Sequence, residues 1–147
     1  MLSKQDFKFI VENTPLVTID FICKDQDGKV LLGKRVNDPA KGYYFTPGGR
    51  IFKNESIKNA ILRLSAKELG TPLQLEALKF NGFYDHLFEN SIFGDLSLHC
   101  VNLAFGHQFS KLPELPDQEH EEYKFFTVED ILSRKDVHEY VRWYFRD

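Results

Sequence analysis

An alternation of apolar and polar residues over 16–23 predicts a β-strand, because successive side chains of a strand point to opposite faces. Asp20 falls in the middle of this strand, on the mixed face opposite the apolar one. The Asp27-Gly28 pair that follows is typical of a hairpin turn and leads into a second strand over about 29–35. The chain therefore starts a sheet early and places an acidic side chain inside it.

The rest of the chain adds strands and helices to this hairpin. Apolar runs predict further strands at 43–46, 75–88, 96–109 and 123–126. We expect the strand at 96–109 to run antiparallel to the one at 75–88. Helical patterns cover residues 3–12, 54–69, 127–133 and 137–145. Ser3 with Asp6, and Thr127 with Asp130, have the spacing of capping boxes at helix starts. Strands around a central helix, with helices at both ends, predict an α/β sandwich built on a mixed sheet.

The central helix follows a glycine turn at Pro47-Gly48-Gly49, which leaves backbone groups free to face a ligand. We expect the helix to begin near 54–55, with Asn54 as N-cap, and to end at Leu69 before Gly70. Glu68 falls within the apolar stripe formed by positions 57, 60, 61 and 64. A carboxylate on the core side needs a compensating cation, donor cluster or proton. Glu68 either pairs with Arg63 or Lys67, lies just past the point where the stripe leaves the core, or serves as a ligand.

Composition narrows the class of protein. A chain of 147 residues with 42% hydrophobic residues is long enough for one domain, which we place at 1–147. A formal charge of -3 without a basic block gives no reason to expect binding to nucleic acid or to a membrane. Two cysteines form no disulfide framework, and no signal peptide or long apolar run is present, so we expect a cytoplasmic protein.

The residues after the glycine turn resemble the Nudix box, G-x5-E-x7-R-E-U-x-E-E-x-G-U, in which U is apolar. The positions that agree are Gly49, Glu55, Arg63, Glu68 and Gly70. The positions that depart are Leu64 and Lys67, where the family has glutamates, and Ser65 and Thr71, where it has apolar residues. Ordinary Nudix hydrolases use several carboxylates on this helix to hold more than one magnesium ion. The departures therefore imply a site with fewer ions.

One branch of the family, the GDP-mannose mannosyl hydrolases, shares these departures. The wider resemblance covers nearly the whole chain and includes the runs Thr14-Pro15-Leu16-Val17, Gly33-Lys34-Arg35, Pro47-Gly48-Gly49-Arg50, Ala66-Lys67-Glu68-Leu69-Gly70 and Pro116-Asp117-Gln118-Glu119-His120. It implies a Nudix α/β/α sandwich with a central mixed β-sheet. It also implies magnesium-dependent cleavage of GDP-mannose, with GDP-glucose and GDP-fucose as further candidates, to GDP and free sugar, and a homodimer with the N-terminal helix as a candidate contact.

The resemblance also implies the metal ligands. They are the carbonyl of Gly48, the carboxylate of Glu68 and a residue of the late loop, where Glu119 stands in place of a family glutamine. Magnesium accepts a few protein oxygens together with waters and phosphate oxygens, so this set suffices. Alternatively, residues 119–122 form only a solvated acidic turn.

Roles for the remaining candidates come from the same resemblance. His120 is the expected general base, since an imidazole titrates in the range that removing a proton from water requires; its alternative is a surface histidine. Arg35 and Arg50 match arginines that bind the diphosphate, and Arg63 is a structural partner of Glu55 or Glu68. Asp20 and His86 are expected to contact substrate, or else have purely structural roles. Cys100 stands about where the family has a tyrosine contacting phosphate.

Two rival functions stay open from the sequence. A conventional Nudix pyrophosphohydrolase would cut the phosphoanhydride and yield GMP and a sugar phosphate, but the loss of glutamates at Leu64 and Lys67 argues against it. A degenerate Nudix domain would bind a nucleotide without turnover. The presence of Gly48, Arg50, Glu68 and His120 together argues against that reading, because a pure binder needs no base beside its metal.

Overall fold

The computed structural model describes residues 2–116 and 122–146. Its helices are α1 (Lys4–Asn13), α2 (Ile57–Leu69), α3 (Val128–Ser133) and α4 (Glu139–Trp143), with a 3₁₀ turn, η1, at Leu75–Ala77. Its strands are β1 (Leu16–Lys24), β2 (Val30–Lys34), β3 (Tyr44–Phe45), β4 (Gly48–Arg50), β5 (Lys79–Phe88), β6 (Leu98–Gln108) and β7 (Tyr123–Phe126). No helix within these described ranges combines the length and the apolar character needed to cross a membrane.

The strands form one mixed sheet in the order β3-β2-β1-β6-β5, with β4 paired to β1 and β7 paired to β2. The parallel pair is β1 with β6, in register from Leu16↔Cys100 to Lys24↔Gln108. β1 and β2 pair at Lys24↔Val30, next to their connecting turn. The other end of β1 pairs with β4 instead, at Thr18↔Arg50, so the glycine turn is inserted beside β1.

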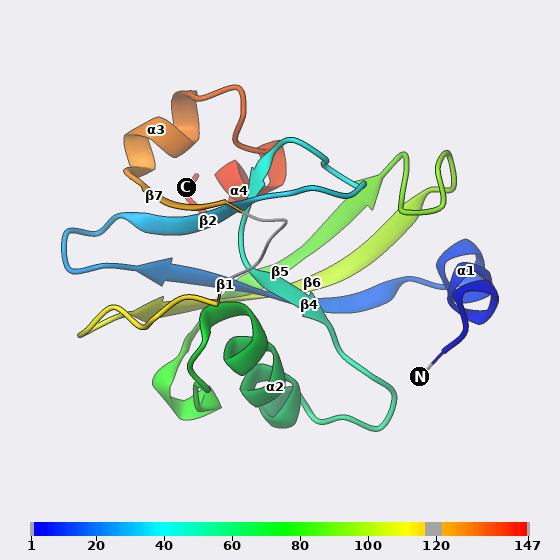
Figure 1. The fold of residues 1–147 in the computed structure, drawn as a ribbon, viewed down its shortest axis with the longest axis horizontal. Coiled ribbons are helices and arrows are strands. Elements are labelled where there is room, and N and C mark those ends of the chain that lie inside the picture. Colours follow the sequence, from blue (N-terminus) through cyan, green and yellow to red (C-terminus); the bar gives the residue numbers. More distant parts are fainter. Residues whose placement is uncertain (1, 117–121, 147) are drawn as a thin grey trace.

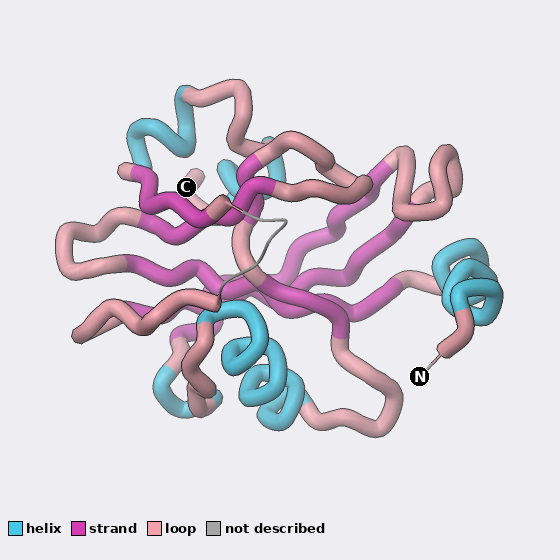
Figure 2. The backbone as a smooth tube through the Cα atoms, in the orientation of Figure 1, coloured by secondary structure: helices cyan, strands magenta, loops and turns pink. Residues whose placement is uncertain are grey.

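Helices cover both faces of this sheet, as Figures 1 and 2 show. On one face, α2 packs on the alternate residues of β1 that the sequence pattern placed together, including the fully buried Ile19 and Phe21. On the other face, α3 and α4 close a second core around Ile22 and Leu32. The predicted α/β sandwich is confirmed, and α1 lies at one end of it.

Helix boundaries follow local capping chemistry. Ser3 and Thr127 accept hydrogen bonds from the backbone N–H groups three residues on, which confirms both predicted helix starts. The predicted start of the central helix was wrong by two residues, since its N-cap is Ser56. Asn54 instead has a left-handed backbone (φ 64°). The predicted stop is confirmed, because Gly70 adopts φ 74° as the C-cap.

Three other expectations need correction. The glycine turn is a short strand, β4, because its backbone pairs with β1. The stretch expected as a strand from 75 begins with η1, and β5 starts only at Lys79. The final helix is shorter than expected, because His138 acts as its N-cap and its side chain accepts a hydrogen bond from the Tyr140 N–H (3.1 Å).

Candidate active site

A pocket of about 260 Å³ brings together every predicted site residue that the structure describes. Strands β1, β4, β5 and β6, helix α2 and the segment after β2 contribute to its walls, which include Asp20, Arg35, Gly48, Arg50, Glu68, His86 and Cys100. Phe45, Phe88 and Leu98 add an apolar side to the same pocket. Glu119 and His120 lie outside the described residues.

Both glycines lie close to neighbouring atoms, but only Gly48 is confined by backbone. A Cβ atom at Gly48 would lie 2.0 Å from the Ile19 carbonyl oxygen, and one at Gly49 would lie 2.6 Å from a Leu64 methyl group. No other residue fits at Gly48 without moving β1. Leu64, which stands where the Nudix box has a glutamate, is a buried core residue (3% exposed) that packs α2 on the glycine strand.

The direction of the Gly48 carbonyl follows from the pairing of β4 with β1. The Phe21 N–H donates to the Pro47 carbonyl, and the Ile51 N–H donates to the Val17 carbonyl, both at 2.8 Å. Because alternate residues of a strand direct their backbone groups to the same side, Gly48 and Arg50 face away from β1. Consistent with this, the Arg50 carbonyl accepts a hydrogen bond from Arg63 of α2 at 2.8 Å.

These directions fit a magnesium ion. The Gly48 carbonyl points away from β1, and half-buried Glu68 of α2 lines the same pocket. A carbonyl oxygen and a carboxylate are ligands that magnesium prefers, with waters and phosphate oxygens completing its octahedron. Within residues 2–116 and 122–146, no group of three or more His, Cys, Asp or Glu side chains is arranged to hold a metal.

Arg63, the box arginine, has a structural role. Its Nε and Nη2 atoms donate to the two carboxylate oxygens of Glu55 at 2.7 and 2.9 Å. This bidentate pair holds the loop before α2 against the helix, and its hydrogen bonds lower the pKa of Glu55. The predicted pairing of Arg63 with Glu55 is confirmed.

Asp20 lies at the centre of a buried hydrogen-bond network. Its Oδ2 atom accepts from the hydroxyls of Thr46 (2.8 Å) and Tyr144 (2.5 Å). The Tyr144 hydroxyl in turn accepts from the Asn102 amide at 2.7 Å, and Thr18 donates to the Asn102 carbonyl oxygen at 3.2 Å. Oδ2 thus accepts two hydrogen bonds, and Asp20 itself lines the pocket.

Burial raises the pKa of Asp20 from 3.8 to about 6, although the hydroxyls of Tyr144 and Thr46 and the charge of Arg35 act in the opposite direction. A raised pKa means that the protonated carboxyl favours the folded state. This contribution to stability is fully present below about pH 4 and is lost as the pH rises through 6. Above pH 6 the folded protein holds a buried carboxylate at a cost in stability.

The variant Asp20→Asn is therefore expected to be more stable than the wild type at pH 8, by up to about 3 kcal/mol, because the amide keeps one acceptor oxygen and carries no charge. Near pH 4 the two proteins should unfold at the same denaturant concentration. Chemical denaturation at both pH values measures the difference. Equal stability at pH 8 would show that the burial of Asp20 carries no electrostatic cost.

His86 is a neutral, buried partner of the same network. Burial and the nearby His138 lower the pKa of His86 to about 4. Its ring stacks on Tyr140 with centroids 4.6 Å apart, and its Nε2 atom lies 3.4 Å from the Tyr144 hydroxyl. At neutral pH the imidazole carries no charge, so it interacts as a hydrogen-bond donor or acceptor and not as a cation.

The two candidate phosphate-binding arginines are held differently. The Nε of Arg35 donates to the Pro39 carbonyl at 2.8 Å, which fixes its side chain at the pocket wall. The guanidinium of Arg50 lies over the rings of Phe7 and Phe52. Cys100 also lines the pocket, but burial raises the pKa of its thiol to about 12. The thiol therefore stays protonated at neutral pH.

The sequence alone did not identify Tyr144, Asn102 and Thr46 as parts of the site. Tyr144 follows α4 and meets Asp20 across 124 positions of the chain. No local pattern marks it, since a tyrosine at the end of an apolar helix is typical of a core position. The one available signal was Asp20 itself, because a carboxylate inside a strand requires donors from elsewhere in the fold.

The fold and the pocket define an α/β protein in which a pocket lies between a glycine strand and a helix, and comparisons with known proteins agree on the fold. The NUDIX domain family matches residues 14–146, and the chain belongs to this family of hydrolases. The low-salt glycan biosynthesis protein Agl8 of Haloferax volcanii is 34% identical over 140 residues, which span 95% of this chain and 85% of that protein.

Other known proteins are similar to this chain at lower sequence identity. The ADP-ribose pyrophosphatase of Methanocaldococcus jannaschii is 26% identical, with 97% of this chain and 83% of that protein covered. A MutT NUDIX hydrolase from Burkholderia pseudomallei superimposes with a TM-score of 0.71 at 25% identity, over 90% of this chain and 96% of that chain. The NUDIX domain of Shewanella oneidensis NrtR, solved with ADP ribose, has a TM-score of 0.65 at 18% identity, over 97% and 95%, and shows the shared fold.

Proposed function

We propose that the protein hydrolyses GDP-mannose to GDP and free mannose, with magnesium as cofactor and with GDP-glucose and GDP-fucose as further candidate substrates. The proposal rests on which of the box positions on α2 carry a carboxylate that lines the pocket. Leu64 is committed to the core and Lys67 is exposed, so Glu68 is the box carboxylate on α2 that lines the pocket. A site with one such carboxylate is poorly equipped to hold several ions around an attacked phosphorus atom.

In this proposal a water molecule attacks the anomeric carbon of the sugar. A new C–O bond forms while the bond from that carbon to the β-phosphate oxygen breaks, and its electron pair leaves with GDP. His120 accepts the proton of the attacking water as general base. Because one water attacks opposite the leaving group, the sugar is released with inverted configuration. Asp20 and the neutral His86, which both line the pocket, are the proposed partners of the sugar hydroxyls.

Charge on the departing GDP grows as the glycosidic bond breaks, so cations at the diphosphate act selectively on the transition state. Arg35 and Arg50 supply two such cations from the pocket wall. Gly48 and Glu68, with Glu119 as the third proposed ligand, would hold magnesium, which neutralises the diphosphate when bound.

A second candidate function is supported by a different relative. The ADP-ribose pyrophosphatase of Methanocaldococcus jannaschii resembles nearly the whole chain, which favours a pyrophosphohydrolase of nucleotide sugars. The two reactions differ in the bond that is cut. Attack at phosphorus would give GMP and mannose phosphate in place of GDP and mannose.

Hydrolysis of GDP-mannose with magnesium in oxygen-18 water separates the candidates. We expect the label in free mannose, with unlabelled GDP, when both products are analysed by mass spectrometry. Label in GMP or mannose phosphate would replace the proposal by phosphoanhydride cleavage. Binding of GDP-mannose without any product would favour a non-catalytic nucleotide-binding domain.

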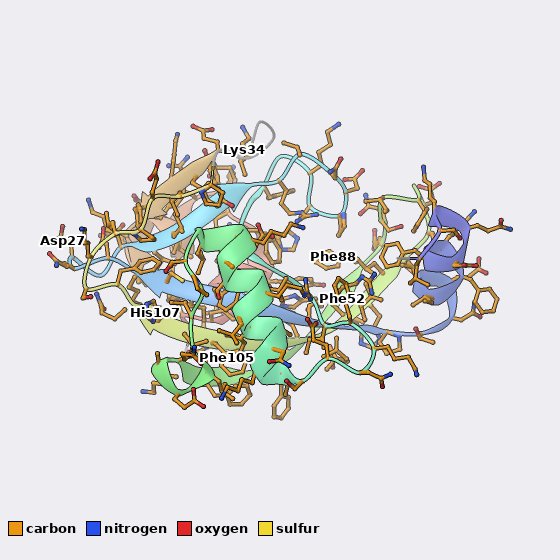
Figure 3. The ribbon with its side chains drawn as sticks, turned by 60° about the horizontal axis from the view of Figure 1, so that its bottom comes forward. Asp27, Lys34, Phe52, Phe88, Phe105 and His107 are labelled. Atoms are coloured by element: carbon orange, nitrogen blue, oxygen red, sulfur yellow. The ribbon has the colours of Figure 1, made fainter. Side chains whose placement is uncertain are left out.

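We also propose a homodimer. An apolar groove of about 1040 Å³ runs between α1 and the loop before α2, and its lining includes Leu2, Ile10, Val17, Phe52, Ile57 and Leu103. Figure 3 shows Phe52 on the side of α2 that faces α1. Exposed apolar area of this kind is typical of a contact with another protein surface. Light scattering should give twice the 17.2 kDa mass of one chain, whereas a mass of 17.2 kDa would exclude the dimer.

A further inference from the structure

Arg50 stands at the border between the polar pocket and the apolar groove, and lines both. Its guanidinium carbon lies 4.9 Å from the ring centre of Phe7 in α1 and 4.8 Å from that of Phe52. These distances are within the range of cation–π attraction, which holds a guanidinium against an aromatic face. Two rings from separate segments therefore restrict one long side chain.

The Phe52 ring is itself anchored. The guanidinium carbon of Arg63 lies 3.8 Å from its centre, and Arg63 is held by the bidentate pair with Glu55. Phe7 is anchored from the other side, because it packs on Phe93 with ring centres 5.8 Å apart. The contacts thus form a continuous series from the 91–94 turn through α1 and Arg50 to α2.

The contacts leave the charge of Arg50 available. Aromatic faces contact a guanidinium without occupying its N–H donors, so the contacts with Phe7 and Phe52 leave these donors to a ligand. An arginine held in one orientation by its carbon framework loses less conformational entropy when it binds an anion.

We propose that Phe7, on the N-terminal helix, is a positioning residue for Arg50, and that it prepares the guanidinium to bind the diphosphate of the substrate. This inference rests on the proposed function, because it takes a nucleoside diphosphate group as the ligand of Arg50. It assigns α1 a role in the site although no residue of α1 lines the polar pocket. Phe7 acts through Arg50 and does not touch the reacting atoms.

The test compares Phe7→Leu with Phe7→Tyr and with Phe9→Leu. Leucine keeps an apolar side chain but removes the aromatic face, whereas tyrosine keeps the face. Phe9 lies on the same helix, is 67% exposed and provides a matched control. Titration calorimetry with GDP and magnesium measures diphosphate binding, and titration with guanosine measures binding without phosphate.

We expect Phe7→Leu to weaken GDP binding about 5- to 20-fold, while its affinity for guanosine stays within about two-fold of the wild type. Phe7→Tyr and Phe9→Leu should bind GDP like the wild type. In the ligand-free protein, the Arg50 Nε–Hε signal in nuclear magnetic resonance should move downfield in Phe7→Leu alone, because the ring current of Phe7 is lost.

Four outcomes would overturn the inference. If Phe7→Leu binds GDP as tightly as the wild type, this inference fails and the proposed function is unaffected. The same holds if the Arg50 signal is unchanged in that variant. An equal loss of GDP and guanosine binding would assign Phe7 a purely structural role. A wild-type protein that binds no GDP would overturn both this inference and the proposed function, so the two failures are distinguishable.

Discussion

Replacing His120 with glutamine is expected to lower kcat for GDP-mannose hydrolysis by about 100-fold or more, because a general base contributes about 10²- to 10⁴-fold to such reactions. Glutamine keeps a polar side chain of similar reach but cannot accept a proton at neutral pH. KM should change little, since the proposed role of His120 is in the chemical step and not in binding. Steady-state kinetics with quantification of released GDP measures both constants.

The matched control for this variant is His107→Gln. His107 lies on β6 and lines cavities other than the candidate active site, and its removal should leave kcat near the wild-type value. Near-normal turnover in His120→Gln would remove His120 from the mechanism. A large rise in KM with unchanged kcat would instead assign it to substrate binding.

Glu68→Gln is expected to raise the magnesium concentration for half-maximal activity by at least about 10- to 100-fold and to lower kcat/KM in proportion. The amide keeps one oxygen but removes the negative charge that attracts a divalent cation. Because Glu68 lies on the pocket side of α2, the change should leave the core packing of Leu64 and Leu69 intact. Activity measured across a magnesium titration gives the shift, and thermal unfolding gives the stability.

Lys67→Gln provides the control at the neighbouring position. Lys67 is exposed on the same helix, so its removal should change neither the magnesium dependence nor turnover by more than about two-fold. If Glu68→Gln keeps the wild-type magnesium dependence, Glu68 is not a ligand. The metal would then be held by other oxygens of the pocket, or the reaction would not use one.

The two variants together separate the parts of the proposal. Loss of turnover at saturating magnesium in His120→Gln, with a shifted magnesium dependence only in Glu68→Gln, would show that the base and the metal ligand act independently. A shifted magnesium dependence in both variants would place His120 in the metal site.

Features that depend on neighbours in sequence could be predicted. The capping residues Ser3 and Thr127, the stop at Gly70 and the apolar face of β1 were all confirmed, because each rests on contacts within a few residues. The start of α2 was missed because Asn54 and Ser56 are both good N-caps. Only the loop geometry, in which Glu55 turns back to bond Phe52 N–H and Arg63, selected Ser56.

The motif spacing also determined which side chains meet around the glycine strand. Gly48, Arg50 and Glu68 converge on one pocket, as the resemblance to the Nudix box implied. It could not show that Leu64 had become a core residue in contact with Gly49. That contact depends on how closely α2 approaches β4, which is a property of the packed fold.

The sequence by itself determined the family and the helix caps at Ser3, Gly70 and Thr127, because local backbone preferences and motif spacing act over few residues. Only the tertiary structure decided that Tyr144 donates to Asp20 across 124 positions, and that Phe7 of α1 reaches Arg50. Those contacts arise when the sheet brings distant segments together and buried polar groups must find partners. The pKa of Asp20 and the orientation of Arg50 follow from that packing.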